Sequence, residues 1–363
     1  MHNNLTVALL TIWHVQNFGA EIQTYATIKV LQKLGLDVKV IDYRLSDEAE
    51  CSNPIKKGIK YVLQVFTPNF WNFYLFWRKN IPKTKRYRSL KQLKNDPPKA
   101  DIYLIGSDQV WNPDIVGKAL PAYFLNFGND QTIRISYASS FGVTEWKYPK
   151  EINDSISQFL STFNAISCRE KTGVNILNNI FDISASNVLD PTLLLDDFSQ
   201  IAKCEIAEPF VAYYPLSPNE EISATAGLIA KKLDCKLINI NKKLAFRSLT
   251  IKRTSLEEWI GAIAKASFVI TSSFHGLTMC LVHRRQFAIV FSDETIRKRS
   301  SRVLDLLDSI GLNDRYFESC EDLVNSNIWE YSIDYNSIEQ ELNNLKEKSM
   351  YFLKNALLNA PQK

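Results

Sequence analysis

The chain has 363 residues, of which 45% are hydrophobic and 12% aromatic, and its formal net charge at pH 7 is +4. This length is typical of two domains, and the composition excludes a disordered or fibrous chain. Its six cysteines form no CxxC pair, and no apolar run reaches the roughly 18 residues of a membrane span, which disfavours a disulfide framework, a zinc site and a transmembrane protein.

The first elements of the chain predict a βαβ unit. An apolar strand at 5–12 has neither the basic start nor the cleavage site of a signal peptide, so we expect a cytoplasmic protein. A polar loop follows it, and then come a helix at 23–35 and a second strand at 37–43.

A basic, aromatic segment at 56–99 then interrupts this alternation as an insertion. Between Lys56 and Lys99 twelve lysines or arginines stand against one acid, a net charge of +11 that leaves −7 for the remainder. Six aromatic residues lie between Phe70 and Trp77. Basic residues beside exposed aromatics favour contact with an anionic membrane surface or a lipid-linked phosphate, so the protein can lie at the inner face of the membrane. The alternative is an aromatic helical hairpin buried against the first domain. Nucleic acid is not expected, because no nucleic-acid motif accompanies the charge.

The alternation resumes after the insertion and restarts in the second half of the chain. Strands at 100–105 and 132–138 are followed by a helix, a short strand that leads into Arg169 and another helix. A change of composition at 195–210 marks a linker. Each later strand precedes a helix pattern, one of which opens with the Ser-x-x-Glu capping pattern at Ser255. These later strands lie at 210–216, 236–241, 267–273 and 286–291.

This pattern predicts an α/β protein with two Rossmann-like doubly wound domains that face each other across a cleft. We assign residues 1–195, with the insertion 56–99, to the N-terminal domain and residues 205–325 to the C-terminal domain. An amphipathic helix at 336–358 is long enough to cross back to the first domain.

Small and polar residues follow the predicted strands where each strand ends. The first domain holds the motifs NFG, GSD, SSFG, CRE and LDP, and the second holds SSFHG at the start of a helix. Each motif alone is typical of a turn. Because ligands of doubly wound sheets bind at the carboxyl ends of strands, the motifs together predict a single site in the cleft.

Several chemistries are disfavoured by the motifs that the sequence lacks. It has neither a GxGxxG fingerprint nor a Walker loop, so dinucleotide and P-loop chemistry are not expected. The four histidines, at 2, 14, 275 and 283, show no paired ligand spacing, so we expect no metal. No cofactor is expected either.

In this order, the motifs NFGAEIQTYAT, LIGSDQVWNP, YASSFG, SCREKTG, LDPTLLL and SSFHGLTMCLV resemble those of the polysaccharide pyruvyl transferase family, across about residues 6–315. The resemblance implies two Rossmann-like domains of the glycosyltransferase-B type. It also implies transfer of a pyruvyl group from phosphoenolpyruvate to sugar hydroxyls of a bacterial cell-surface polysaccharide precursor, as a ketal. The implied partners are phosphoenolpyruvate and a sugar acceptor, which is lipid-linked if the insertion contacts a membrane.

The implied reaction gives roles to the motif residues. Arg169 is the predicted clamp for phosphoenolpyruvate, because a bidentate guanidinium fits a carboxylate or a phosphate. His275 and Asp108 are the predicted catalytic residues for the two proton transfers that ketal formation requires. The predicted phosphate cradle is the helix start formed by Ser272, Ser273 and the N–H groups around Gly276.

One position departs from the pattern that the resemblance implies. The family pattern has an arginine two residues before the histidine, where this chain has Ser273. Arg299 or Arg302 would supply the missing charge. Further substrate contacts are predicted in the first domain at Asn17, Gly19, Gln23 and Ser107. Two alternatives stay open: a glycosyltransferase of the same architecture that uses a nucleotide sugar, and a non-catalytic protein that binds a sugar phosphate.

Overall fold

The computed structural model describes residues 5–44, 68–217, 219–240, 254–291 and 300–358. These residues pack as two compact units, which we describe separately. Unit 1 comprises the described residues of Met1–Phe66, Leu75–Leu195 and Asn344–Lys363, and unit 2 comprises those of Thr67–Tyr74 and Asp196–Asn343.

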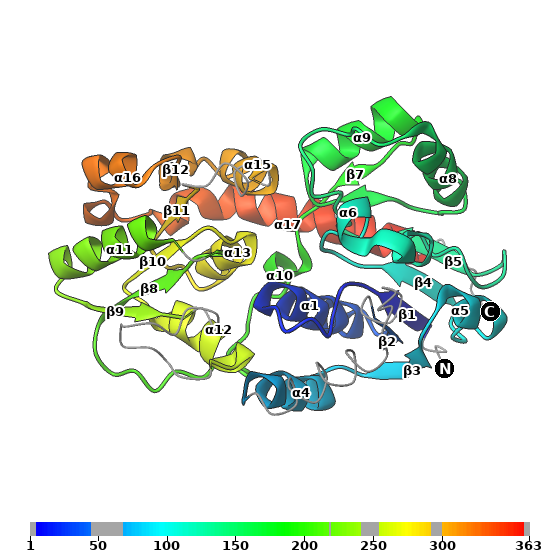
Figure 1. The fold of residues 1–363 in the computed structure, drawn as a ribbon, viewed down its shortest axis with the longest axis horizontal. Coiled ribbons are helices and arrows are strands. Elements are labelled where there is room, and N and C mark those ends of the chain that lie inside the picture. Colours follow the sequence, from blue (N-terminus) through cyan, green and yellow to red (C-terminus); the bar gives the residue numbers. More distant parts are fainter. Residues whose placement is uncertain (1–4, 45–67, 218, 241–253, 292–299, 359–363) are drawn as a thin grey trace. The chain divides into compact units, whose positions relative to one another are not determined.

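The main sheet of unit 1 has five parallel strands in the order β3-β2-β1-β4-β5 (Figure 1). Most of these strands are runs of buried apolar residues, as expected for a parallel sheet that is covered on both faces. A two-stranded parallel sheet lies next to β5, to which the bridge between Ile135 and Ala165 connects it. The strands are β1 (Thr6–Leu10), β2 (Asp37–Tyr43), β3 (Lys83–Tyr87), β4 (Ile102–Ile105), β5 (Ile133–Ser136), β6 (Ser167–Cys168) and β7 (Ser186–Asn187).

Several helices of unit 1 begin at a capping side chain. Asn17 caps α1 (Phe18–Lys33), which ends just before Gly35, a residue with φ of 83°. Asp190 caps α10 (Pro191–Leu194). The other helices are α5 (Leu90–Asn95), α6 (Pro113–Val116), η1 (Gly117–Ala119), α7 (Leu120–Tyr123), α8 (Lys150–Leu160) and α9 (Lys171–Phe181), while α4 (Pro68–Asn80) and α17 (Tyr335–Leu358) have residues in both units.

β3 is a strand that the sequence analysis does not predict. It lies within the basic insertion, has the sequence KTKRY and forms one edge of the main sheet of unit 1. Most of its side chains are exposed, so the segment lacks the apolar pattern of a buried strand. Charged residues are frequent on edge strands because they discourage pairing with another chain. The described part of the insertion therefore contributes a strand to the sheet.

Unit 2 contains a second parallel sheet, in the order β12-β11-β10-β8-β9. Its strands are β8 (Phe210–Tyr214), β9 (Lys236–Asn239), β10 (Phe268–Thr271), β11 (Phe287–Val290) and β12 (Tyr316–Phe317). Neighbouring residues of a strand point to opposite faces of the sheet, and in β8 both faces are covered by helices. Tyr213 packs in a core cluster with Ile222. Tyr214 meets the ring of Trp259 edge-on, with ring centroids 5.2 Å apart.

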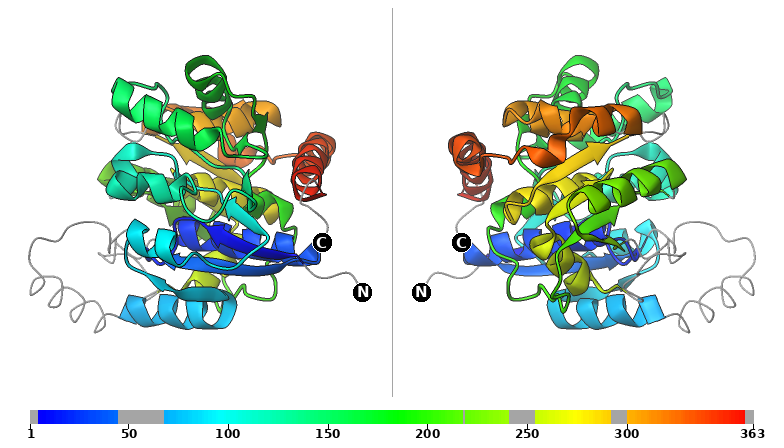
Figure 2. Two further views of the ribbon diagram at one scale, coloured as in Figure 1. Left: turned by 90° about the vertical axis from the view of Figure 1, so that its right-hand side faces the viewer. Right: turned by 90° about the vertical axis from the view of Figure 1, so that its left-hand side faces the viewer.

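The helices of unit 2 form two groups (Figures 1 and 2). On one face α11 (Glu220–Lys232) contacts α16 (Cys320–Ser326), and the other group consists of α12 (Leu256–Lys265), α13 (Phe274–Val282) and α15 (Ser301–Ser309). The predicted capping box of Ser255 with Glu258 is present at the start of α12. The remaining elements are the short helices η2 (Asn313–Arg315) and η3 (Ile328–Glu330).

In each of the two large sheets, the strand that comes first in the chain lies between two strands that come later, so the strand order changes direction there. In unit 1 β1 lies between β2 and β4, and in unit 2 β8 lies between β9 and β10. Ligands of doubly wound sheets bind outside the carboxyl ends of the strands at such a switch point. The loops after β1 and β4, and after β8 and β10, are therefore where a site is expected.

Candidate functional site

Three of the predicted motifs in unit 1 form one group of loops at the carboxyl edge of the sheet. Asp108 forms a bridge with Ser139, and Ser139 forms another with Cys168. The N–H of Ser140 donates to the carbonyl of Asp108, and the N–H of Arg169 donates to the carbonyl of Ser139. GSD, SSFG and CRE are thus neighbours, because the carboxyl ends of parallel strands meet at one edge.

Arg169 lies within this group and faces three carboxylates. Its Nη1 donates to Oδ2 of Asp190 at 2.9 Å and to Oγ of Ser107 at 3.3 Å. Other guanidinium nitrogens lie 3.8 Å from an oxygen of Asp108 and 3.9 Å from an oxygen of Glu170. Burial disfavours the charged guanidinium, but the carboxylates, Asp190 foremost, outweigh burial and raise the pKa of Arg169.

This geometry gives Arg169 partners within its own unit. The side chain is 1% exposed, and with all three carboxylates ionised the group has a formal charge of −2. The guanidinium is thus engaged by carboxylates of the protein. The role of Arg169 as a clamp for phosphoenolpyruvate stays a prediction.

Asp190 connects the LDP motif to the same group. Its Oδ2 accepts from the hydroxyl of Ser107 at 2.7 Å as well as from Arg169. Its Oδ1 accepts from the N–H of Thr192 at 3.0 Å and from the hydroxyl of Thr192 at 2.7 Å. Ser107, predicted as a substrate contact, is 0% exposed and donates its hydroxyl to Asp190, and its contact with a substrate stays a prediction.

Asp108 differs from the other two carboxylates in exposure and in backbone conformation. Its side chain is 18% exposed, against 1% for Glu170 and 0% for Asp190. Its φ is 81°, in the left-handed region that is unfavourable for a residue other than glycine. Strain of this kind persists where the surrounding structure fixes a side chain, and it is frequent at functional sites. Asp108 is thus the most accessible of the three carboxylates in this group.

The loop after β1 gives structural roles to the contacts predicted there. Asn17 accepts from the N–H of Gly19 at 2.9 Å and so caps α1. Gln23 is 0% exposed, and its amide donates to the hydroxyl of Thr11 at 2.9 Å. That hydroxyl donates in turn to the carbonyl of Ser107 at 2.8 Å. Gln23 therefore ties the loop after β1 to the loop after β4, and its contact with a substrate stays a prediction.

His14 is a residue of this edge that the sequence analysis does not select. It directly follows the first strand, which is the signal that could have found it, and its φ is 63°. Its ring stacks on Trp77 with centroids 3.7 Å apart. Burial, and then the charge of Arg44, lower the pKa of His14 to about 3, so the imidazole is neutral at pH 7 and offers one hydrogen-bond donor and one acceptor.

In unit 2 the SSFHG motif lies at the switch point between β8 and β10. The hydroxyl of Thr271 donates to the carbonyl of Tyr214 at 2.6 Å, which joins the ends of the two strands. Oγ of Ser272 accepts from the N–H of Leu216 at 2.9 Å, which joins the loops that follow them. The motif is thus held at the place where a doubly wound sheet binds its ligand.

The helix α13 begins within this motif and positions His275. Ser273 is the N-cap, and its Oγ accepts from the N–H of Gly276 at 3.2 Å. This bond removes the Gly276 N–H from the predicted phosphate cradle. A Cβ at Gly276 would lie 2.6 Å from Oγ1 of Thr271, so the glycine serves close packing of the helix on the strand. His275, 8% exposed, lies in the first turn, where the helix dipole favours an anion.

One of the two arginines predicted to replace the family arginine lies beside this motif. The guanidinium carbon of Arg302 is 5.7 Å from the ring centroid of Phe274, the residue before His275. The rings of Phe274 and His275 are 5.4 Å apart between centroids. Arg299 lies outside the described residues. The expectation that the loops of both units share one site stays a prediction, because the units are described separately.

Metal binding and membrane insertion each require a feature that can be recognised in the structure. No group of three or more His, Cys, Asp or Glu side chains in the described part of the chain could hold a metal ion. No helix within the described ranges combines the length and the hydropathy of a membrane span.

The fold of the chain is similar to that of nucleotide-sugar enzymes. UDP-GlcNAc 2-epimerase of Methanocaldococcus jannaschii, solved with UDP-GlcNAc and UDP, has 12% identity and a TM-score of 0.56, with 96% of this chain and 99% of that chain covered. UDP-N-acetylglucosamine 2-epimerase of Rickettsia bellii has 10% identity and a TM-score of 0.55, with 97% of each chain covered. UDP-GlcNAc 2-epimerase of Neisseria meningitidis, bound to UDP-GlcNAc, has 11% identity and a TM-score of 0.53, with 98% and 100% covered.

These similarities confirm the predicted α/β class with two Rossmann-like domains of the glycosyltransferase-B type. At such low identity they concern the fold alone. A search of curated proteins finds no match. In sequence, the model of the family described as polysaccharide pyruvyl transferase matches residues 17–293, which is most of the chain.

Proposed function

The chain belongs to the polysaccharide pyruvyl transferase family, and from this premise we propose that it transfers a pyruvyl group from phosphoenolpyruvate to two hydroxyls of a sugar in a cell-surface polysaccharide precursor. The observation that carries the proposal is the position of His275, in the first turn of α13 at the switch point of unit 2. At this position His275, the proposed proton donor, lies at a helix N-terminus, and a helix N-terminus favours phosphate.

The reaction adds one proton to the donor carbon, removes one from each of two sugar hydroxyls and releases inorganic phosphate. Protonation of the methylene carbon turns it into a methyl group and leaves an oxocarbenium-like centre at the neighbouring carbon. One sugar hydroxyl attacks this centre and loses its proton. The phosphate then leaves as the second hydroxyl attacks, and the second proton goes to the phosphate. The product is a cyclic ketal that keeps the carboxylate of the donor.

The residues of unit 2 fit the donor side of this reaction. We assign the proton transfer to the methylene carbon to His275, because an imidazole can both donate and accept a proton. The phosphate of the donor would lie against the start of α13, with the hydroxyl of Ser272 as a hydrogen-bond donor. Arg302 would supply the positive charge that Ser273 does not, because it already lies beside Phe274.

The residues of unit 1 fit the acceptor side. Asp108, partly exposed and held in a left-handed conformation, is the proposed base for the attacking sugar hydroxyl. Arg169 is a positioning residue, since it lies 3.8 Å from the carboxylate of Asp108 and is itself fixed by Asp190. A group of net negative charge is better suited to remove a proton from a hydroxyl than to bind a phosphate.

A glycosyltransferase that uses a nucleotide sugar is the second candidate, because solved structures of similar fold contain UDP-GlcNAc. The two candidates differ in the ligand that stabilises the protein and in the product released. Pyruvyl transfer predicts a rise of the melting temperature with phosphoenolpyruvate, and phosphate release only when an acceptor sugar is added. A rise with UDP-GlcNAc alone would favour the second candidate, and binding without turnover of any donor would favour a sugar-phosphate binding protein.

We further propose that the acceptor is lipid-linked and that α4 contacts the membrane surface. The helix has a buried face that includes Phe73 and Phe76, each 1% exposed. Its other face carries Trp71, Tyr74 and Leu75, which are 48%, 39% and 58% exposed and have the i, i+3, i+4 spacing of one helix face. Between residues 68 and 99 nine lysines or arginines stand against one acid, so the aromatic face lies within a strongly basic segment. An anionic lipid surface complements both features.

Replacing both Trp71 and Leu75 with serine should weaken binding to phosphatidylglycerol-containing vesicles by about tenfold, because two apolar side chains no longer enter the interface. Co-sedimentation with the vesicles measures this change. The matched control replaces Ile180 and Leu228 with serine. These two residues lie on other helices and are 47% and 40% exposed. If the two double variants bind equally, the proposed membrane face is wrong.

A further inference from the structure

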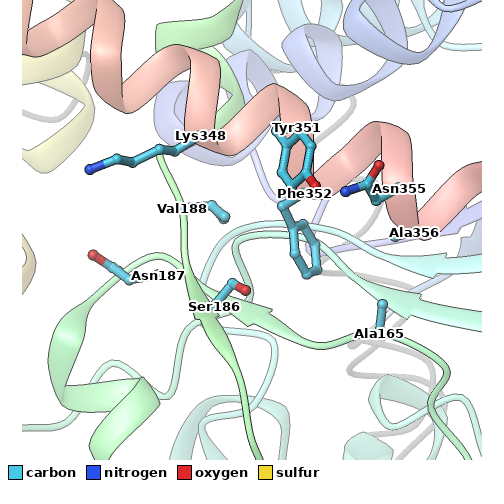
Figure 3. Close-up of a pocket in the computed structure, with 9 residues that line it drawn as sticks. All are labelled: Ala165, Ser186, Asn187, Val188, Lys348, Tyr351, Phe352, Asn355 and Ala356. Carbon is cyan, nitrogen blue, oxygen red and sulfur yellow. The ribbon is translucent and has the colours of Figure 1, made fainter.

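A groove of about 500 Å³ in unit 1 lies apart from the motifs discussed so far. One wall is the second half of α17 and the other is the segment around β7 (Figure 3). Figure 3 shows Lys348 extended over the end of the groove near Asn187, while the ring of Phe352 points from α17 toward the strand. Its lining includes Ser186, Asn187, Lys348, Tyr351, Phe352 and Asn355.

The two walls of this groove are fixed to each other. The N–H of Leu189, just after β7, donates to Oγ of Ser349 on α17 at 2.9 Å. The ring of Phe352 packs against Tyr137, with centroids 6.5 Å apart, and Tyr137 donates its hydroxyl to the carbonyl of Leu189 at 3.0 Å. Phe352 is therefore held against the body of unit 1. A groove of this volume lies in the range of small-ligand sites, about 300–1,000 Å³.

The lining combines an exposed aromatic ring with side chains that both donate and accept hydrogen bonds. Tyr351 is 71% exposed, although aromatic rings are usually covered. The amides of Asn187 and Asn355 and the hydroxyl of Ser186 lie in the same groove. A pyranose ring carries C–H groups on its faces and hydroxyls around its rim. The C–H groups pack on the electron-rich face of an aromatic ring, and the hydroxyls pair with amides.

The charge of the groove selects among saccharides. Lys348 is the one charged side chain among the described residues that line it. Its ammonium is exposed and so is available to a carboxylate. We propose that the groove binds an acidic saccharide, namely a sugar that already carries a pyruvate ketal. The proposal rests on the proposed function, because that carboxylate belongs to its product, and it makes the groove a second contact with the modified glycan.

Binding to the intact protein tests this proposal without any donor or turnover. The probes are methyl glycosides of glucose, galactose and mannose, each with and without a 4,6-pyruvate ketal, titrated by saturation-transfer NMR and calorimetry. We expect at least one ketal to bind about fivefold more tightly than its unmodified sugar, the size of a solvent-exposed ion pair. K348Q should bring this ratio close to one, and Y351A should weaken both forms by about tenfold, because the aromatic surface is lost.

K354Q is the matched control, because Lys354 is exposed on the same helix but does not line the groove. The proposal is overturned if no ketal binds, if ketal and plain sugar bind equally, or if K348Q and Y351A change nothing that K354Q does not. A protein that binds the ketal with these effects but transfers no pyruvyl group would contradict the proposed function and leave this site intact.

Discussion

Replacing His275 with asparagine is expected to lower the rate of pyruvyl transfer by about 10²–10⁴-fold, the usual effect of removing a general acid or base. Asparagine keeps a hydrogen-bonding side chain of similar reach but cannot exchange a proton near neutral pH. The loss should therefore lie mainly in kcat, with the KM for phosphoenolpyruvate changed little. Phosphate release in the presence of an acceptor measures both constants.

The chain supplies a control on the same helix. His283 is the C-cap residue of α13, and burial, followed by the charge of Arg285, lowers its pKa to about 4. H283N should keep the rate within about twofold, since this imidazole stays neutral at pH 7 and lies at the other end of the helix. If H275N keeps the rate within threefold while its melting temperature is unchanged, His275 is not the proton donor.

Replacing Asp190 with asparagine should lower the free energy of unfolding by about 3–5 kcal/mol, because one partner of a buried ion pair is lost. Asp190 accepts hydrogen bonds from the guanidinium of Arg169, from the hydroxyl of Ser107, and from the N–H and hydroxyl of Thr192. The amide nitrogen of asparagine would face at least one of these donors. Urea denaturation followed by tryptophan fluorescence measures the change.

D154N is the control for this measurement. Asp154 pairs with Lys150 on the surface of unit 1, where the two side chains are 62% and 81% exposed. Solvent screens such a pair, so its loss should change the free energy of unfolding by less than about 1 kcal/mol. Equal effects of D190N and D154N would show that the carboxylates around Arg169 do not stabilise unit 1.

The fold could be predicted from the sequence wherever buried residues produce a recognisable pattern of apolar side chains. Strands such as Ile102–Ile105 and Phe268–Thr271 are buried on both faces, so they stand out as apolar runs between helices. The same reasoning misses Lys83–Tyr87, because an edge strand made of charged residues has no such pattern. That strand is recognised by its pairing with Asp37–Tyr43, and a contact between segments distant in the sequence leaves no local sequence pattern.

The site could be predicted as a set of loops but not as a set of contacts. GSD, SSFG and CRE come together because parallel strands end at one edge, which the order of elements already implies. The partners of Arg169 could not be predicted, since Asp190 is 21 residues away in sequence and Ser107 is 62. The left-handed conformation of Asp108 depends equally on the packed structure. The sequence therefore suggests Arg169 as a clamp for an anion but does not show that three carboxylates of its own unit face the guanidinium.

The fate of the donor carbons tests the central claim most directly. Phosphoenolpyruvate labelled with ¹³C at its second carbon is incubated in D₂O with the protein and a candidate acceptor glycan, and the product is examined by NMR. Pyruvyl transfer predicts a quaternary ketal carbon on the sugar, a methyl group that has gained one deuterium, and one phosphate released per ketal. A label that stays in phosphoenolpyruvate with every acceptor, or that reaches the sugar with its methylene group intact, would contradict pyruvyl transfer by this chain.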